Sequence, residues 1–135
     1  MPALDPIGHV TSPLTDRHAA PKQGSEGSPE AWIELRPEFR DAARDLRVGS
    51  AILVLTWLDR AARDVQLVHP RDKEHAELRG VFSTRSPDRP NPIGIHRVTI
   101  LEVDDGLRFK VRDLEAIDGT PIVDIKPVLD RDRER

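Results

Sequence analysis

Cysteine is absent from the 135 residues of this chain, which excludes disulfides, thiolate catalysis and cysteine-ligated metals within it. Tyrosine is absent too, and aromatic residues make up only 4% of the sequence. A surface on which many bases stack is therefore disfavoured. An excess of positive charge is also missing, because 21 Lys and Arg residues stand against 24 Asp and Glu. Binding to nucleic acid would have to use a local group of cations.

Long hydrophobic runs are missing as well. The longest, residues 51–58, is interrupted by Thr56 and is too short to span a bilayer. The first residues have neither a basic start nor an apolar stretch, so no secretory signal is predicted. We expect a cytoplasmic protein without membrane contact, which the lack of cysteine also fits.

The length and the 37% of hydrophobic residues suit one domain with one core. We expect a single domain over residues 1–135, with its ordered part at about 6–129. The alternating charges of residues 130–135 predict a frayed tail.

Several signatures of catalysis and cofactor binding are not found. There is no phosphate-binding loop, no G-x-G-x-x-G after a strand, no H-E-x-x-H and no G-x-S-x-G. The five histidines are scattered without the spacing of metal ligands, so no metal site is expected. The absence of a G-x-G-x-x-G motif also disfavours a glycine-rich nucleotide-binding fold.

Twelve prolines with short apolar runs between them predict a mainly β fold, a small single-domain barrel or sandwich with one short helix and long loops. Proline breaks helix interiors and therefore argues against a helical bundle. The helix is expected over residues 37–46, where apolar residues recur three or four positions apart. Strands are expected at 9–11, 31–35, 51–55, 64–69, 80–84, 93–103, 107–112 and 121–125.

The segment 107–112 alternates apolar residues with Arg108, Lys110 and Arg112. This period of two predicts a strand with one buried face and one basic face. The basic row is the best candidate in the chain for contact with a phosphate backbone. The alternative is an ordinary solvated strand face.

Residues 80–94 are unusually rich in Pro, Arg, Asn and Gly. The prolines restrict the backbone before any ligand binds. Arg85 and Arg89 add two planar donor groups suited to a carboxylate or a phosphate, and Asn91 can satisfy backbone groups or contact a purine edge. A rigid surface turn with solvated arginines is the alternative.

A second such segment covers residues 118–127. Asp118 and Gly119 are typical of a turn, and Asp124 and Lys126 share one face of the following strand, where they can pair. An ion pair that serves only the fold is the other interpretation.

Taken together, the two segments resemble the TsaA-like (TrmO, VirR) family. The resemblance rests on the ordered sequences Arg-Ser-Pro-Asp-Arg-Pro-Asn-Pro-Ile-Gly at 85–94, Asp-Gly-Thr-Pro at 118–121 and Asp-Ile-Lys-Pro at 124–127. The start agrees too, with Ile-Gly at 7–8, Ser-Pro at 12–13 and Pro-Lys-Gln at 21–23. The resemblance covers residues 6–129.

The resemblance implies a β-barrel that binds S-adenosylmethionine without a glycine-rich fold. Characterised members of the family are homodimeric tRNA methyltransferases that methylate N6 of threonylcarbamoyladenosine at position 37. We therefore expect this activity on tRNA. Two alternatives remain: a methyltransferase acting on a small metabolite, and a regulator that binds the cofactor without catalysis.

The resemblance also implies where the cofactor is held. Contacts are expected from Gln23, Gly24, Ser25, Glu26, Asp59, Arg60, Arg85, Arg89, Asn91, Ile95, Arg112, Asp113, Leu114 and Glu115. Among these, we expect Arg85 to hold the methionine carboxylate and backbone groups of 112–115 to contact the adenine. Glu115 or Glu26 would lie near the sulfonium.

A proton acceptor is not identified by the sequence. Asp118 and Asp124 are candidates, although a turn and a strand also explain them. The chain departs from many members of the family at Glu115, where they have Asp, and at Val128, where Tyr is common.

Overall fold

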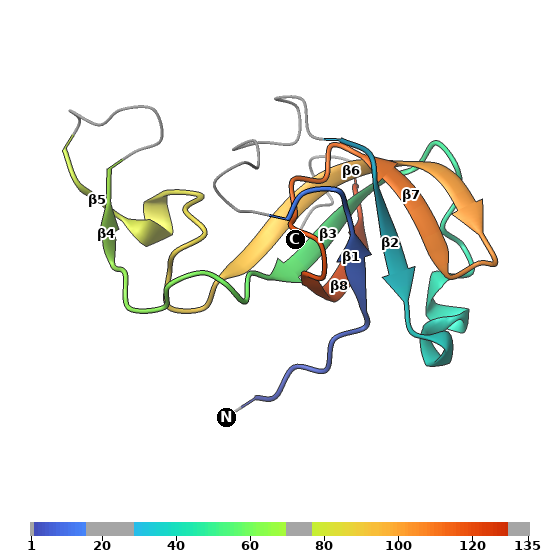
Figure 1. Ribbon diagram of the computed structural model, residues 1–135, viewed down its shortest axis with the longest axis horizontal. Coiled ribbons are helices and arrows are strands. Elements are labelled where there is room, and N and C mark those ends of the chain that lie inside the picture. Colours follow the sequence, from blue (N-terminus) through green and yellow to red (C-terminus); the bar gives the residue numbers. More distant parts are fainter. Residues whose placement is uncertain (1, 16–28, 70–76, 130–135) are drawn as a thin grey trace.

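The computed structural model describes residues 2–15, 29–69 and 77–129. Within these residues, six strands close into a barrel in the order β1-β2-β7-β6-β3-β8, with antiparallel neighbours throughout (Figure 1). The strands are β1 (Gly8–Thr11), β2 (Ala31–Leu35), β3 (Ala51–Trp57), β6 (Ile93–Asp104), β7 (Arg108–Arg112) and β8 (Pro121–Pro127). The predicted mainly β barrel is confirmed.

The barrel is filled by the alternate apolar residues of its strands. In β3, for example, Ile52 and Val54 are buried, while Leu53 between them and Leu55 after them are only partly covered. Phe109 is the largest fully buried side chain, and Ile33 and Ile100 are also fully buried. Burying a side chain of this size stabilises the fold by roughly 1.5–3 kcal/mol, so the alternation seen in the sequence directly provides the core.

The predicted helix at 37–46 is wrong. This segment forms two short 3₁₀ turns, η2 (Pro37–Phe39) and η3 (Asp41–Ala43). Their backbone bonds join residues three apart, for example Arg40 N to Pro37 O and Leu46 N to Ala43 O. Only Ala43 is buried in the two turns. Too little apolar surface is covered to support a longer helix, which is marginal by itself at this length.

The strands predicted at 64–69 and 80–84 are much shorter in the structure. They reduce to β4 (Leu67–Val68) and β5 (Arg79–Gly80), which within the described part of the chain pair only with each other. A 3₁₀ turn, η4 (Val81–Ser83), follows β5. Figure 1 shows this hairpin projecting from the barrel as an arm. Without a third strand to pair with, the ladder is limited to a few residues.

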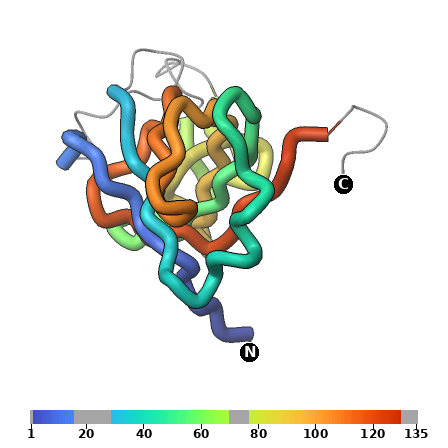
Figure 2. Tube along the Cα trace, turned by 90° about the vertical axis from the view of Figure 1, so that its right-hand side faces the viewer, coloured from blue at the N-terminus to red at the C-terminus, as the bar shows by residue number. Residues whose placement is uncertain are grey.

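The predicted turn at Asp118 and Gly119 is confirmed, and a second tight turn joins β6 to β7. Asp105 and Gly106 have φ values of 56° and 67° between β6 and β7, and Gly119 has a φ of 85° just before β8. Asp and Gly tolerate this left-handed region better than other residues. After β8 the chain leaves the barrel, as the red tube in Figure 2 shows.

Candidate functional site

Three loops meet where β1 ends and β8 begins. Ser12 N donates to Asp118 Oδ1 at 2.9 Å, and Asp118 N donates to Leu14 O at 2.7 Å. Arg60 Nη1 donates to Thr15 O at 3.1 Å. These bonds tie the loop after β1, the turn after β3 and the connection between β7 and β8 to one another.

The proline-rich segment lies along the turn after β3. Arg89 N donates to Ala62 O at 3.0 Å, and Ala62 N donates to Asp88 Oδ1 at 2.8 Å. Leu58 N donates to Pro92 O at 2.8 Å. The structure thus brings the segment 85–92 together with the turn that contains Asp59 and Arg60, two groups of predicted cofactor contacts.

Arg89 holds its own loop. Its guanidinium donates to the carbonyl oxygens of Val81 at 2.7 Å, Ser86 at 3.0 Å and Thr84 at 3.1 Å. An arginine that satisfies three carbonyls in one loop fixes the shape of that loop. In this conformation its donors are directed into the protein backbone, so Arg89 shapes the segment from which a neighbouring arginine can act.

Arg85 is such a neighbour. It is exposed, and among residues 2–15, 29–69 and 77–129 no hydrogen bond or ion pair is found for its guanidinium. A planar donor fork on a stiffened loop can bind a carboxylate in a bidentate manner. Arg85 therefore fits the predicted role.

Asn91 is bound by a residue that the sequence interpretation missed. Arg63 Nη2 donates to Asn91 Oδ1 at 2.9 Å and Arg63 Nε donates to Pro90 O at 2.8 Å. The same guanidinium lies 5.1 Å from the ring centroid of Trp57. Arg63 thus joins the end of β3 to the proline-rich segment, a contact that no local spacing in the sequence indicates.

Inside the barrel lies a polar group that sequence reasoning also missed. His96 Nε2 is 2.9 Å from Thr56 Oγ1, and His96 Nδ1 is 4.0 Å from Glu115 Oε1. Burial lowers the pKa of His96 from 6.5 to about 4, so the imidazole is neutral near pH 7. The signal was available: His96 occupies an inward position of β6, in phase with Val98 and Ile100.

The predicted residues 112–115 begin with Arg112, the last residue of β7, and end with Glu115, which approaches this polar group. Asp113 has a φ of 70°, so the chain turns sharply there. Leu114 is fully buried, which leaves its backbone rather than its side chain to contact a ligand. Glu115 lies next to buried His96 with 23% of its side chain exposed, and its Oε2 is buried.

Ile95 points away from this group. Side chains alternate along a strand, so Ile95 and His96 face opposite sides of β6. Ile95 is 42% exposed, whereas His96 is buried. The structure therefore does not place the Ile95 side chain beside Glu115. Gln23, Gly24, Ser25 and Glu26 lie outside the described residues.

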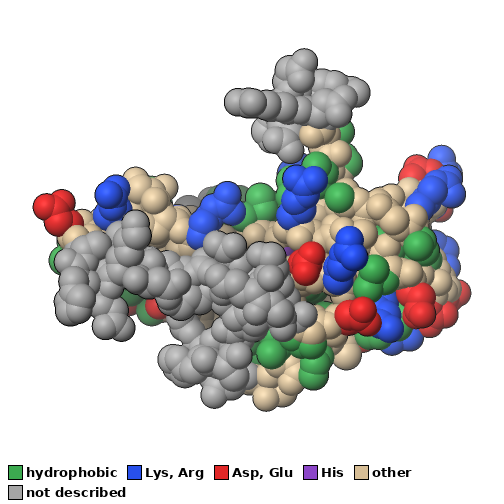
Figure 3. All heavy atoms as spheres, turned by 90° about the horizontal axis from the view of Figure 1, so that it is seen from above, with side chains coloured by type: hydrophobic (Ala, Val, Ile, Leu, Met, Phe, Trp, Pro, Cys, Tyr) green, Lys and Arg blue, Asp and Glu red, His purple; other side chains and the backbone are tan. Residues whose placement is uncertain are grey.

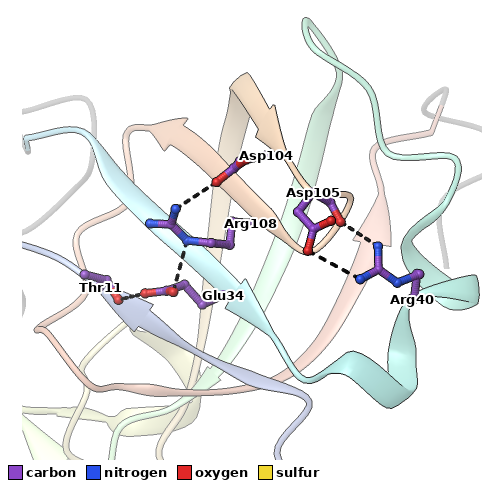
Figure 4. A network of polar contacts seen from close by, with 6 residues as sticks. All are labelled: Thr11, Glu34, Arg40, Asp104, Asp105 and Arg108. Atoms are coloured by element: carbon purple, nitrogen blue, oxygen red, sulfur yellow. Dashed lines mark hydrogen bonds and ion pairs between the residues drawn. The ribbon is translucent and has the colours of Figure 1, made fainter.

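The basic row on β7 is paired with acids. Arg108 donates to Glu34 Oε1 at 3.1 Å and to Asp104 Oδ2 at 2.9 Å, as Figure 4 shows, and lies 4.5 Å from the Trp32 ring centroid. Lys110 Nζ is 3.2 Å from Glu30 Oε1. Arg112 Nε is 4.0 Å from Asp113 Oδ2. The acids largely neutralise the row, which favours the alternative of an ordinary strand face over contact with a phosphate backbone.

Glu34 is the centre of this network. It accepts a hydrogen bond from Thr11 and then from Arg108, and these contacts lower the pKa of its carboxyl. In the view of Figure 3, cationic side chains are likewise spread over the surface with acids among them. The described residues visible in this view form no single broad cationic field.

The two candidate proton acceptors have structural partners. Asp118 accepts from Ser12 N, as described above. Asp124 Oδ1 accepts from Ile125 N at 2.9 Å, and its other oxygen lies 3.5 Å from Lys126 Nζ. The predicted Asp124–Lys126 pair is confirmed. Neither carboxylate is a member of the His96–Glu115 group.

This small barrel thus carries a buried neutral imidazole with a carboxylate 4.0 Å away, and a rigid loop that bears the exposed Arg85. The sequence at residues 9–132 matches the tRNA-methyltransferase O N-terminal domain. The chain belongs to this family, as its TsaA-like sequences predicted. No helix of the described residues is long and apolar enough to cross a membrane.

Several relatives are similar over nearly the whole chain. A probable S-adenosyl-L-methionine-binding protein of Methanothermobacter thermautotrophicus is 49% identical over 92% of this chain and 88% of its own length. An S-adenosyl-L-methionine-binding protein of Archaeoglobus fulgidus is 45% identical over 91% of this chain and 86% of its own. These names agree with the predicted cofactor.

A solved structure shares the fold. The crystal structure of TrmO from Pseudomonas aeruginosa superposes with a TM-score of 0.77 at 28% sequence identity. It covers 100% of this chain, whereas this chain covers 59% of the TrmO chain. The chain thus spans a little over half the length of that protein.

Proposed function

We propose that this chain is an S-adenosylmethionine-dependent methyltransferase that methylates N6 of threonylcarbamoyladenosine at position 37 of tRNA. Membership of the tRNA-methyltransferase O family and the names of its relatives support the proposal. The structural observation that carries it is the approach of His96 to Glu115. His96 lies on β6, which follows the proline-rich segment, and Glu115 lies in the segment 112–115. Their approach brings together the two segments between which we propose the cofactor site.

The residues present fit the cofactor. Exposed Arg85 suits its carboxylate, and the backbone around buried Leu114 offers donors and acceptors for the adenine. Glu115 would stabilise the positive sulfonium, since a carboxylate at a partly buried site interacts more strongly with a cation than one in open water. When bound, the sulfonium supplies an already activated methyl group. The chain's own task is then to orient the acceptor nitrogen.

Contact with tRNA needs cations outside the neutralised row on β7. Arg79 on the arm and Arg97 on β6 are exposed and provide them. Because each phosphate contact releases counterions, methylation of tRNA should weaken steeply as salt is added. Since tRNA is a cytoplasmic substrate, the proposal places the protein in the cytoplasm.

A homodimer is part of the proposal. The arm carries exposed Leu67, Leu78 and Phe82, the last with 82% of its surface accessible, and β6 carries exposed Ile93 and Ile95. Both patches belong to one chain, so a two-fold arrangement can place the arm of each copy on the barrel of the other. Replacing Phe82 by Ser should shift the sedimentation of the native chain toward the monomer; unchanged sedimentation contradicts this dimer.

Analysis of tRNA nucleosides tests the activity. Deletion of the gene should remove the methyl group from threonylcarbamoyladenosine, and the native gene should restore it. Unchanged nucleosides contradict the tRNA substrate.

A second function, methylation of a small metabolite, is favoured by the neutralised row on β7. In that case turnover should proceed without RNA and should not fall steeply with salt. Cofactor binding without transfer to any acceptor would instead indicate a regulator.

A further inference from the structure

The Thr56–His96 pair is built into the wall of the barrel. Thr56 is 0% and His96 is 7% exposed, and they lie on the neighbouring strands β3 and β6. Gly94 leaves the room that they need, because a Cβ at this position would lie 2.5 Å from Thr56 Oγ1 and 2.9 Å from His96 Nε2. The pair thus fills a space that a larger residue at position 94 would close.

The surroundings select one tautomer of His96. A neutral imidazole has one N–H donor and one acceptor nitrogen. Nδ1 is the atom nearest to the Glu115 carboxylate, which when ionised can only accept. With the proton on Nδ1, Nε2 is the acceptor and Thr56 Oγ1–H donates to it. Thr56 then donates to His96, and the N–H donor of His96 is directed toward Glu115.

His96 and Glu115 are close but not hydrogen-bonded. His96 Nδ1 is buried and has no hydrogen-bond partner among the described residues, and its distance of 4.0 Å from Glu115 Oε1 is longer than a hydrogen bond. A buried donor without a partner costs free energy. A shift of Glu115 toward His96 would satisfy this donor and would fix the position of the carboxylate.

We propose that His96, held by Thr56, is a positioning residue that donates from Nδ1 to Glu115 and orients the carboxylate toward the positive centre of the bound cofactor. This inference rests on the proposed function, since it names what places Glu115 at that site. His96 itself contacts neither the cofactor nor the methyl acceptor.

Two substitutions at His96 test the roles of its two ring nitrogens separately. The amide of Asn at position 96 reaches the place of Nδ1, whereas the amide of Gln reaches the place of Nε2. His96→Asn therefore keeps a donor for Glu115, and His96→Gln keeps only the contact with Thr56. Both variants retain a buried polar side chain of similar size, so their melting temperatures serve as the control for folding.

Calorimetry with S-adenosylmethionine and with its neutral thioether product, S-adenosylhomocysteine, gives the readout. For His96→Gln we expect affinity for S-adenosylmethionine to fall about tenfold, as for the loss of a hydrogen bond to a charged group. Affinity for S-adenosylhomocysteine should change much less, because it has no positive sulfur. His96→Asn should bind both within about threefold of the native chain. Equal losses in the two variants, or equal losses for both ligands, overturn the proposal.

Nitrogen-15 NMR of the native chain without ligand tests the same arrangement independently. The His96 ring should show a proton on Nδ1 and an acceptor at Nε2; the opposite tautomer overturns the proposal. If the native chain binds neither nucleoside while the Nδ1–H tautomer is present, the proposed function fails and the positioning role fails with it. The opposite tautomer in a chain that binds both ligands overturns the positioning role alone.

Discussion

Arg89 Nη2 lies 2.7 Å from the carbonyl oxygen of Val81, and its Nη1 bonds to two further carbonyls of the same loop. Arg85, four residues earlier, is exposed. Two arginines that look equivalent in the sequence therefore have different tasks. Arg89 keeps the loop in shape, and Arg85 is the one for which we propose a role in ligand binding.

This difference predicts opposite effects on stability and binding. Arg89→Ala should lower the free energy of unfolding by about 1–3 kcal/mol, because three carbonyls lose a charged donor. Arg85→Ala should change it by less than about 0.5 kcal/mol, as is usual for an exposed side chain. Urea denaturation measures both. Equal effects of the two substitutions would contradict this division of roles.

Stability should depend on the protonation of His96. Its pKa is about 4 in the folded chain and 6.5 in the reference state, so the unfolded chain binds more protons between these values. The contribution of neutral His96 to the free energy of unfolding is then fully present above pH 6.5 and is lost as the pH falls toward 4. From pH 7 to pH 5 the loss should be about 2 kcal/mol. Glu115, 4.0 Å away, attracts the charged imidazole and opposes part of this loss.

The comparison that isolates His96 is urea denaturation at pH 7 and pH 5 for the native chain, His96→Asn and His9→Asn. The first variant should lose most of the pH dependence, and the second, at an exposed position, should retain it. A pH dependence that survives in His96→Asn would show that other groups cause it.

Close packing between β1 and β2 depends on Gly8. A Cβ at this position would lie 2.2 Å from the backbone oxygen of Glu34, which cannot move without disturbing the strand pair. Gly8→Ala should therefore cost about 3 kcal/mol. Gly80→Ala is the matched control, because nothing lies within 4 Å of its added Cβ. Thermal unfolding of the two variants tests this, and a Gly8→Ala variant as stable as Gly80→Ala would refute it.

The network around Glu34 should contribute modestly. Glu34→Gln removes the charge that Arg108 contacts, and we expect a loss of about 1 kcal/mol at pH 7. Because the pKa of Glu34 is lowered, first by the hydrogen bond from Thr11, this contribution is present above pH 4.5 and is lost at lower pH. Glu102→Gln, at an exposed position of β6, is the control. A loss of equal size in both variants would contradict a specific role of Glu34.

The fold was largely predictable because local patterns decide it. Period-two alternation in segments such as 107–112 places one face in the core whatever the rest of the chain does. The errors arose where tertiary context decides. Residues 37–46 have a helical spacing, yet they bury little beyond Ala43 and form 3₁₀ turns. Residues 80–84 look like a strand but have no sheet to join beyond β4.

The site was predictable only in part. The segments 85–94 and 112–115 were indicated by their ordered sequences, and these indicate a family more directly than a geometry. Arg63, Thr56 and His96 were missed because their partners are far away in the sequence; Thr56 and His96 are 40 positions apart. The charges on β7 were visible, but their pairing with Glu34 and Glu30 depends on strand order.

The central claim is that the arginine-bearing loop and the Glu115 loop bind S-adenosylmethionine together. Isothermal titration calorimetry of the native chain and of Arg85→Ala with this compound tests it most directly. We predict one saturable binding event per chain and, in the variant, an affinity weaker by about 1.5–3 kcal/mol, the contribution of a hydrogen bond to a charged group. Absence of binding by the native chain, or an affinity that Arg85→Ala leaves unchanged, would contradict it.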